Sequence, residues 1–426
     1  MPVHEPAFQS PIASGNSHRL LEQYKLVRSA SERLCEPLAV EDYVIQSMPD
    51  ASPAKWHLAH TTWFFETFVL KPATAGYKSF DERFGYLFNS YYLAAGERHC
   101  RPRRGLLSRP TVREVYDYRH AIDQQMIRLL DRDPPADVAG VIELGLHHEQ
   151  QHQELLLTDI KHAFWVNPLR PVYQKSSPQP TPPPAPMRWV SFAGGLDRIG
   201  HGGDSFAYDN ESPRHQVLLQ GFDLGSRLVS SGEYRAFIDD GGYRRGELWL
   251  SEGWSTVRNQ QWTAPLYWEQ RDGQWWNMTL GGMRPVEDSE PVCHLSYFEA
   301  DAFARWAGAR LPREAEWEVA AAGLAIEGSF VEAGQFHPAP CHDNQNLAQM
   351  FGELWQWTAS PYVGYPGYKP PPGAIGEYNG KFMCNQWVLR GGSCATPRSH
   401  IRRTYRNFFP ADARWQFTGL RLARDA

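Results

Sequence analysis

Apolar positions recur every three or four residues in four segments of the amino-terminal part of the chain, which is the periodicity of amphipathic helices. The segments are 17–34, 52–70, 111–130 and 134–164. Helices of this kind bury their apolar faces against one another. The pattern therefore predicts an amino-terminal four-helix bundle.

Beyond residue 188 the pattern changes to short aromatic runs that Gly, Pro, Asn and Asp interrupt. Only 230–241 and 296–309 have good helical periodicity there. Short runs with frequent breakers predict an irregular mixture of strands and helices. The predicted fold class is therefore α+β, with the helical bundle first and the irregular domain second.

A proline-rich stretch, PQPTPPPAP at 178–186, separates the two patterns. Proline lacks a backbone N–H and restricts the residue before it, so the stretch predicts an extended connector. We expect a helical domain at 1–170, a linker at 171–187 and a second domain at 188–426.

Composition narrows the class of protein. The chain has 43 basic and 48 acidic residues, a balance that argues against nucleic acid or an anionic membrane as the partner. No run reaches the ~18 apolar residues of a membrane span, and the amino terminus lacks the features of a signal peptide. Six cysteines without a CxxC pair are typical of reduced thiols. We expect a cytoplasmic protein that binds neither nucleic acid nor membrane, with its oligomeric state left open.

The candidate chemistry begins with LHHEQQHQELLL at 146–157. His148 and His152 are one helical turn apart on the apolar face, so both imidazoles should point into the bundle. Unsatisfied ring nitrogens are costly in an apolar core, and a metal ion would satisfy them. His147 lies about 100° around the helix, so we expect it at the surface or behind the ligands. Because short HxxxH motifs also occur without metal, the interpretation needs a third ligand.

The segment SPAKWHLAHTTWFF offers His57 and His60 as the third ligand, and helical periodicity fits either one. Carboxylates are the alternative, with Glu149, Glu154 and Asp159 as candidates. We favour three imidazoles, because carboxylates on such a helix are more often solvated or lie behind the ligands. Three imidazoles suit both zinc hydrolysis and iron(II) oxygen chemistry, so the metal stays open on this reasoning.

Two motifs give a specific resemblance. SPAKWHLAHTTWFFE and HHEQQHQE resemble the DinB-like helical domain of ergothioneine-biosynthesis sulfoxide synthases. The second part resembles their formylglycine-generating-enzyme-like (sulfatase-modifying-factor) domain, which has a C-type-lectin-like fold. The segments that carry this second resemblance are 222–243, 291–323, 350–362, 389–409 and 417–425.

The resemblance implies an iron(II) site formed by His60, His148 and His152, with His57 in a packing or supporting position. It also implies that Gln151 helps to hold the ammonium end of the substrate. The implied reaction uses O2 and joins a thiol to C2 of the imidazole of Nα-trimethylhistidine (hercynine), with oxidation to a sulfoxide. No organic cofactor is expected.

Further roles follow from the same resemblance. The stretch NSYY places Tyr91 or Tyr92 as the proton donor that steers the reaction away from thiol dioxygenation, without deciding between them. Arginines just beyond, Arg101 and Arg104, suit substrate carboxylates. Near the carboxyl terminus, an aromatic segment is expected to cradle the trimethylammonium group: Trp415, Gln416 and Phe417.

Departures from the formylglycine-generating enzymes exclude their activity. Those enzymes need two cysteines after the RGGS turn, where this chain has Thr396 and Ile401, and Cys394 does not replace the pair. Their calcium sites use an Asn and a Glu where this chain has Gln349 and Gln356, so the sequence argues against calcium without excluding it.

Other functions stay open at this point. A selenoneine synthase, which takes a selenosugar in place of the thiol, resembles the leading family in both domains. A DinB-like zinc hydrolase or thiol transferase would use the same three histidines without O2. A binding protein with a vestigial metal site is the third class, and the inward histidine pair argues against it. The thiol itself, cysteine or γ-glutamylcysteine, is not determined by the sequence.

Overall fold

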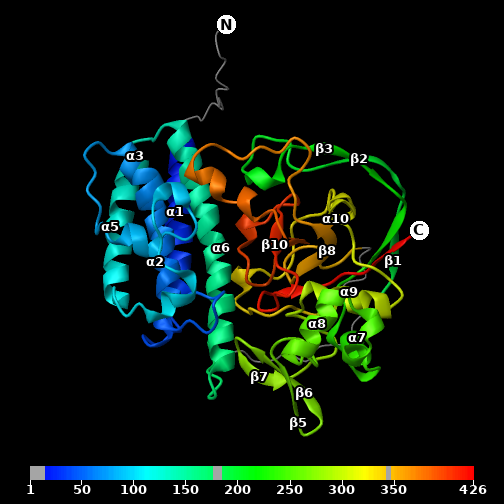
Figure 1. The fold of residues 1–426 in the computed structure, drawn as a ribbon. Coiled ribbons are helices and arrows are strands. Elements are labelled where there is room, and N and C mark those ends of the chain that lie inside the picture. Colours follow the sequence, from blue (N-terminus) through cyan, green and yellow to red (C-terminus); the bar gives the residue numbers. More distant parts are fainter. Residues whose placement is uncertain (1–14, 176–184, 342–346) are drawn as a thin grey trace. The chain divides into compact units, whose positions relative to one another are not determined.

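The computed structural model describes residues 15–175, 185–341 and 347–426 of a chain that divides into two compact units (Figure 1). The first unit holds residues up to Ile160 together with 203–206 and 373–377, and the second unit holds the rest. Most of the proline-rich stretch at 178–186, predicted as a linker, lies outside the described residues.

The first unit is the predicted helical bundle, and each of the four expected helices is present (Figure 1). Short 3-10 and π segments join or extend the long helices. In chain order the elements are α1 (Gly15–Arg33), η1 (Asp42–Val44), α2 (Ala54–Phe65), η2 (Glu66–Leu70), α3 (Lys71–Ala73), α4 (Phe84–Phe88), η3 (Leu93–Ala95), η4 (Arg101–Leu106), α5 (Val112–Leu130) and α6 (Ala136–Val166).

Helix α5 shows why these segments are helical. Thr111 caps its amino terminus in a capping box with Glu114, which satisfies backbone N–H groups that the helix leaves open. Its buried apolar residues follow at intervals of three or four: Val115, Tyr118, Ile122, Met126 and Leu130. This stripe packs the helix into the bundle. Helix α2 differs, because all of its residues are buried, so it is the central helix of the unit.

Helix α6 approaches α2 closely at Gly145. A Cβ atom at this position would lie 2.7 Å from the Phe65 ring and 2.9 Å from the Phe64 ring. Glycine therefore allows the two helices to pack against each other one turn before His148. This contact brings the histidines of α6 near those of α2.

A buried ionic network joins three helices of the bundle. The Glu149 carboxylate on α6 accepts hydrogen bonds from Arg28 on α1 (2.8 Å) and Arg119 on α5 (2.6 Å). Burial by itself would raise the pKa of Glu149, but the charges of Arg119 and Arg28 outweigh burial and lower it to about 2. Glu149 is therefore a structural anion that holds α6 in place, and it binds arginines rather than facing the three histidines.

The described residues of the second unit form four small sheets. Within the described residues, the strand orders are β1-β4-β12, β10-β9-β8-β11, β2-β3 and β5-β6-β7. All pairings are antiparallel except that of β11 with β8, and Trp357 of β8 stands opposite Leu389 of β9. The strands are β1 (Trp189–Phe192), β2 (Gly195–Ile199), β3 (His215–Leu219), β4 (Phe222–Gly225), β5 (Trp268–Arg271), β6 (Gln274–Thr279), β7 (Gly282–Pro285), β8 (Trp355–Pro361), β9 (Trp387–Arg390), β10 (Asn407–Phe409), β11 (Thr418–Gly419) and β12 (Ala423–Asp425).

Both helices predicted for the second unit are present, as α7 (Ser231–Asp239) and α9 (Tyr297–Trp306), and each begins with a capping box. Two further helices were not predicted: α8 (Ser251–Gln260) and α10 (Glu314–Ala320). The second unit is thus a mixture of short strands and helices, and the predicted α+β class is confirmed.

A buried arginine, Arg421, lies at the positions where formylglycine-generating enzymes bind calcium. The guanidinium of Arg421 donates to the side-chain oxygen of Gln356 and to the backbone oxygens of Gly225, Ala348 and Gln349. The Gln356 oxygen also accepts from the Trp317 indole N–H, at 3.0 Å. The guanidinium of Arg421 therefore occupies the oxygens around Gln349 and Gln356, the positions at which the sequence left calcium open.

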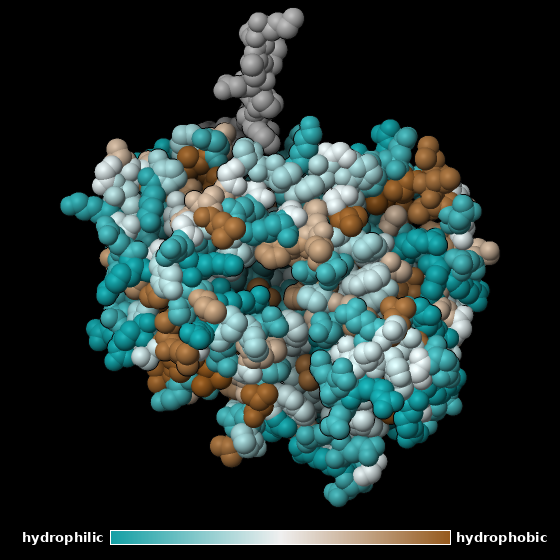
Figure 2. Space-filling model, in the orientation of Figure 1, coloured by the Kyte–Doolittle hydropathy of each residue, from teal (hydrophilic) through white to brown (hydrophobic). Residues whose placement is uncertain are grey.

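The membrane-spanning potential, the polarity of the surface and the cysteines can be compared with what the composition predicts. None of the helices in the described part of the chain is long and apolar enough to cross a membrane. On the face shown in Figure 2, hydrophilic residues predominate and hydrophobic residues form small scattered groups. All six cysteines lie in the described residues, and none of them takes part in a disulfide there, which is consistent with the predicted reduced thiols.

Candidate metal centre

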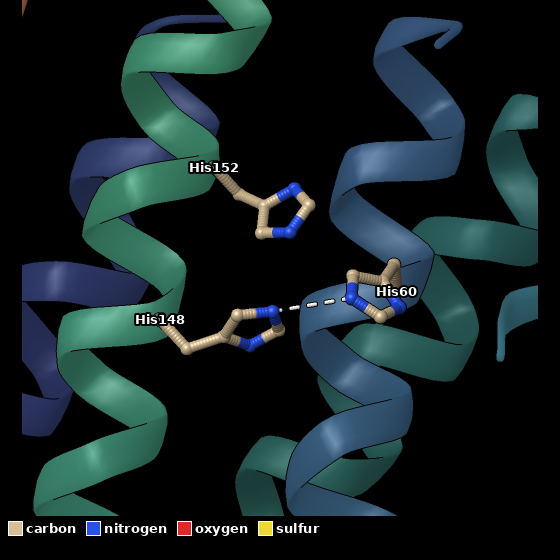
Figure 3. Close-up of side chains that lie close together, drawn as sticks. All are labelled: His60, His148 and His152. Carbon is tan, nitrogen blue, oxygen red and sulfur yellow. Dashed lines mark hydrogen bonds between the residues drawn. The ribbon is translucent and has the colours of Figure 1, made fainter. Parts of the chain in front are cut away.

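Three histidines from two helices of the first unit lie close together (Figure 3). His60 belongs to α2, and His148 and His152 belong to α6. One ring nitrogen from each lies within 4.8 Å of the others, and the Nε2 atoms of His60 and His148 are 3.1 Å apart. Of the described residues, these three form the one group of histidine, cysteine or carboxylate side chains placed to share a metal ion.

The backbone fixes the orientation of His60. Its Nδ1 lies 2.6 Å from the carbonyl oxygen of Phe88. A carbonyl can only accept, so Nδ1 carries the hydrogen and Nε2 presents a lone pair toward His148. This is the arrangement of a metal-binding histidine whose other ring nitrogen is held by the protein.

Burial keeps the three imidazoles neutral. It lowers the pKa of His60 and of His152 well below the usual value, and it lowers the pKa of His148 to about 3. A metal ion requires the neutral form of histidine. The donor set therefore fits a divalent metal ion.

His57 lies behind His152 rather than within the cluster. Its Nδ1 is 2.8 Å from Nδ1 of His152, and its Nε2 is 3.0 Å from the carboxylate of Asp159. Helical periodicity could not decide whether His57 or His60 is the third ligand. In the structure His60 belongs to the group of three, whereas His57 is hydrogen-bonded to the carboxylate of Asp159.

Trp56 and Arg104 border the cluster. The indole of Trp56 is stacked with the His60 ring, and the guanidinium carbon of Arg104 lies 3.4 Å from the centre of the indole. Arg104 is buried and donates to the hydroxyls of Ser52 (2.9 Å) and Ser90 (3.4 Å), while its Nε has no hydrogen-bond partner in the ranges that the structure describes. Among the described residues it forms no ion pair or hydrogen bond with a carboxylate, although the charge of Asp159 lies near enough to raise its pKa against the effect of burial.

The tyrosines lie beyond Trp63 as seen from His60. Trp63 is stacked with His60 at 5.5 Å between ring centres, and the Tyr92 ring lies 5.7 Å from Trp63. Tyr91 and Tyr92 are stacked on each other, and their hydroxyls are 3.5 Å apart. Tyr92 is fully buried and Tyr91 is half-buried. The structure thus places both tyrosines in the same unit as the three histidines.

Two polar residues hold this tyrosine loop. Asn89 donates to the carbonyl of Tyr92 and accepts from its N–H. The Glu377 carboxylate accepts from the N–H groups of Leu93 and Ala94, each at 2.9 Å. Sequence reasoning missed Glu377, since nothing local relates it to a loop so far away along the chain.

The other predicted residues of this unit are more peripheral. Arg101 is exposed and donates to the carbonyl of Asp50. Gln151 is half-buried on α6, between the two histidines of that helix. His147 is half-buried and stacked on Phe206, at 4.0 Å between ring centres.

The predicted aromatic segment belongs to the second unit. Trp415 is half-buried and packs edge-on against Phe409. Gln416 is buried, and its side-chain nitrogen has no hydrogen-bond partner within the described part of the chain. Phe417 is buried, with the ammonium of Lys161 lying 4.9 Å from its ring centre.

The positions that formylglycine-generating enzymes reserve for their two cysteines hold Thr396 and Ile401. Both side chains are buried, and so is nearby Cys394. The second unit therefore lacks the thiol pair of those enzymes.

Comparison with known proteins agrees with this architecture. Residues 23–156 match the DinB superfamily, and residues 174–345 and 333–426 match the sulfatase-modifying factor enzyme 1-like domain. The chain is 31% identical to the hercynine oxygenase of Mycobacterium tuberculosis, over 88% of this chain and 92% of that protein. The chain belongs to the hercynine oxygenase family. Its resemblance to ergothioneine-biosynthesis enzymes is confirmed.

Other members of the hercynine oxygenase family align over similar lengths. The hercynine oxygenase of Mycolicibacterium smegmatis is 30% identical over 95% of this chain and 98% of its own. The ergothioneine biosynthesis protein 1 of Schizosaccharomyces pombe is 29% identical over 52% of this chain and 28% of its own length. As a family member, the chain is an oxygen-dependent oxidoreductase.

Proposed function

We propose that this chain is an iron(II)-dependent sulfoxide synthase that uses O2 to join a thiol to C2 of the imidazole of hercynine. The thiol is cysteine or γ-glutamylcysteine. The observation that carries the proposal is the group of three neutral histidines, two of them buried and one half-buried, in a member of the hercynine oxygenase family. The reaction balances, because one oxygen atom of O2 enters the sulfoxide and the other leaves as water with the thiol and C2 hydrogens.

His60, His148 and His152 would hold the metal. Neutral imidazoles suit iron(II) and zinc alike, and membership of an oxygenase family favours iron. When bound, iron(II) supplies the redox chemistry by which O2 reacts with the two substrates. The surrounding residues then have to bind and orient the substrates and exclude water.

Arg104 suits the carboxylate of the thiol substrate. It is buried, stacked on Trp56 and without an acidic partner among the described residues. A substrate carboxylate would supply the missing anion through the planar guanidinium. Arg101, at the other end of the same short helix η4, would assist at the exposed side, and Gln151 would hold the amino end of hercynine.

Tyr91 and Tyr92 would supply the proton that favours sulfoxide over sulfinic acid. Tyr92 is the more sheltered of the two, and its hydroxyl lies 3.5 Å from that of Tyr91. A proton can pass between hydroxyls in such contact, so the pair can act together. Asn89 and Glu377 would keep the pair in place through the backbone of the loop.

Trp415, Gln416 and Phe417 of the second unit would receive the trimethylammonium group of hercynine. Aromatic faces bind quaternary ammonium groups through cation–π attraction. The free side-chain nitrogen of Gln416 adds a hydrogen-bond donor to this segment.

The test is turnover of hercynine with cysteine and iron(II) in the presence and absence of O2. The proposal expects a sulfur-linked product that carries one added oxygen atom, formed only with O2. Turnover that persists without O2, or with zinc alone, would favour the hydrolase or transferase instead. Parallel reactions with γ-glutamylcysteine and with a selenosugar identify the donor, and a strong preference for the selenosugar would make the chain a selenoneine synthase.

A further inference from the structure

We infer that His57 and Asp159 act as a positioning relay that fixes the tautomer of His152 and so directs its Nε2 toward the metal. The inference rests on the proposed function in that it takes His152 as a metal ligand. It assigns His57 a defined role in the site, although His57 does not belong to the group of three.

The relay is a continuous line of hydrogen bonds inside the first unit. The Asp159 carboxylate accepts from the backbone N–H of Ser52 at 2.7 Å, and the same oxygen lies 3.0 Å from Nε2 of His57. Nδ1 of His57 lies 2.8 Å from Nδ1 of His152. His57 and Asp159 are 3% and 7% exposed, so water does not replace these contacts.

The acceptor at one end decides the direction of every hydrogen bond in the line. The Asp159 carboxylate accepts, so Nε2 of His57 carries a hydrogen. In the neutral ring, Nδ1 of His57 then has a lone pair and accepts from Nδ1–H of His152. His152 is left with its lone pair on Nε2, the atom that remains for a metal.

The opposite direction of the hydrogen bond between His57 and His152 would prevent His152 from binding the metal. If Nδ1 of His57 donated to His152, the neutral ring of His152 would carry its hydrogen on Nε2. That nitrogen could not bind a metal. The carboxylate therefore keeps His152 ready to bind, just as the Phe88 carbonyl does for His60.

The same contacts fix the ring in space. His57 precedes His60 by one turn of α2, and Asp159 follows His152 by two turns of α6, so the line joins the two helices that carry the ligands. Partners that hold metal-bound histidines in this way are commonly worth about 10- to 100-fold in metal affinity.

The test uses Co(II) as a spectroscopic probe of the full-length protein. In His57→Phe the ring keeps its bulk but offers no acceptor to His152, so we expect the Kd for Co(II) to rise about 10- to 100-fold, with a changed visible spectrum. In His57→Asn the amide oxygen stands close to the former Nδ1 and can still accept. This variant should keep its Kd within about threefold of wild type and retain the spectrum.

His120→Gln is the matched control, because His120 is an exposed histidine on α5, outside the line. It should bind Co(II) as wild type does. Thermal unfolding of each variant shows that the fold is retained. Equal Co(II) binding by His57→Phe and wild type would overturn the relay while leaving the metal site intact.

A second measurement does not depend on any variant folding. Side-chain ¹⁵N chemical shifts of the metal-free wild type report the tautomer of each histidine. We expect the Nδ1–H form for His152 and the Nε2–H form for His57. The Nε2–H form of His152 would contradict the relay, and failure of the wild type to bind Co(II) or iron(II) would contradict the proposed function instead.

Discussion

The indole of Trp56 is stacked on the imidazole of His60, with ring centres 4.6 Å apart and planes 11° apart. The same indole lies against the guanidinium of Arg104. One aromatic side chain therefore packs against both a candidate metal ligand and the buried cation proposed to bind a substrate carboxylate. This arrangement places the proposed carboxylate-binding residue of η4 beside the candidate metal ligand of α2, with the Trp56 indole in contact with both.

Replacing Arg104 with Met should weaken binding of the thiol substrate selectively. The variant keeps an apolar side chain against Trp56 but removes a charged hydrogen-bond donor worth roughly 1.5–3 kcal/mol, so KM for the thiol should rise about 10- to 100-fold. KM for hercynine should change little. Steady-state kinetics with each substrate varied in turn gives both values, and the exposed Arg113 supplies the control Arg113→Met. An equal rise in both KM values would argue against a carboxylate contact.

Replacing Tyr91 or Tyr92 with Phe should change which product forms rather than stop the reaction. Removal of the proton donor should divert turnover from the sulfoxide toward the sulfinic acid of the thiol, because proton delivery no longer favours coupling. Mass spectrometry of both products gives the ratio. The tyrosine whose loss changes the ratio more is the donor, and an unchanged ratio in both variants would remove the pair from the mechanism.

Glu377 should influence the same ratio from outside the site. Its carboxylate holds the N–H groups of Leu93 and Ala94, directly after the tyrosine pair. In Glu377→Ala the loop loses both hydrogen bonds, so we expect a several-fold larger share of sulfinic acid with little change in the affinity for iron(II). Glu332→Ala is the matched control, since Glu332 also accepts from a backbone N–H at a 3-10 helix, that of Arg398, but belongs to the second unit. If the two variants gave the wild-type ratio, Glu377 would have no role in placing the tyrosines.

Lys161 should make stability depend on pH in the alkaline range. Burial lowers the pKa of Lys161 to about 8, and its ammonium donates to Nε2 of His294 at 2.6 Å. Below pH 8 the lysine is charged in both the folded and the unfolded chain, and the cost of burying the charge is present. Between pH 8 and about 10.4 the folded chain releases this proton before the unfolded chain does, so folding gains stability as pH rises.

The comparison that isolates this effect is wild type against Lys161→Met. The free energy of unfolding of wild type should rise relative to the variant by roughly 3 kcal/mol between pH ~8 and ~10.5, at about 1.4 kcal/mol per pKa unit. Urea unfolding at several pH values measures the difference. Lys25→Met, at an exposed lysine, should show no such trend, and parallel curves for wild type and Lys161→Met would show that Lys161 keeps an ordinary pKa.

Long-range periodicity made the first unit predictable. The stripe from Val115 to Leu130 recurs through α5 at helical spacing, and the expected helix was found with nearly the same bounds. Helices α8 and α10 were not predicted, because they are short and their sequences include Gly253 and closely spaced charges that weaken the helical pattern. Their stability depends on packing within the second unit, which a local pattern does not show.

The choice between His57 and His60 marks where periodicity fails. Every residue of α2 is buried, so this helix has no polar face to indicate its orientation. Only the partners from other segments distinguish the two rings: Asp159 for His57, and the Phe88 carbonyl for His60. Family resemblance supplied the assignment of His60 that the local sequence could not.

The central claim is that His60, His148 and His152 together hold one ferrous ion. The most direct measurement is the iron content of metal-free protein reloaded anaerobically with iron(II), for wild type and for each histidine changed to Gln. The account predicts one iron per chain in wild type, loss of tight binding in all three variants, and retention in His120→Gln. Full iron binding by any one of the three variants would contradict it.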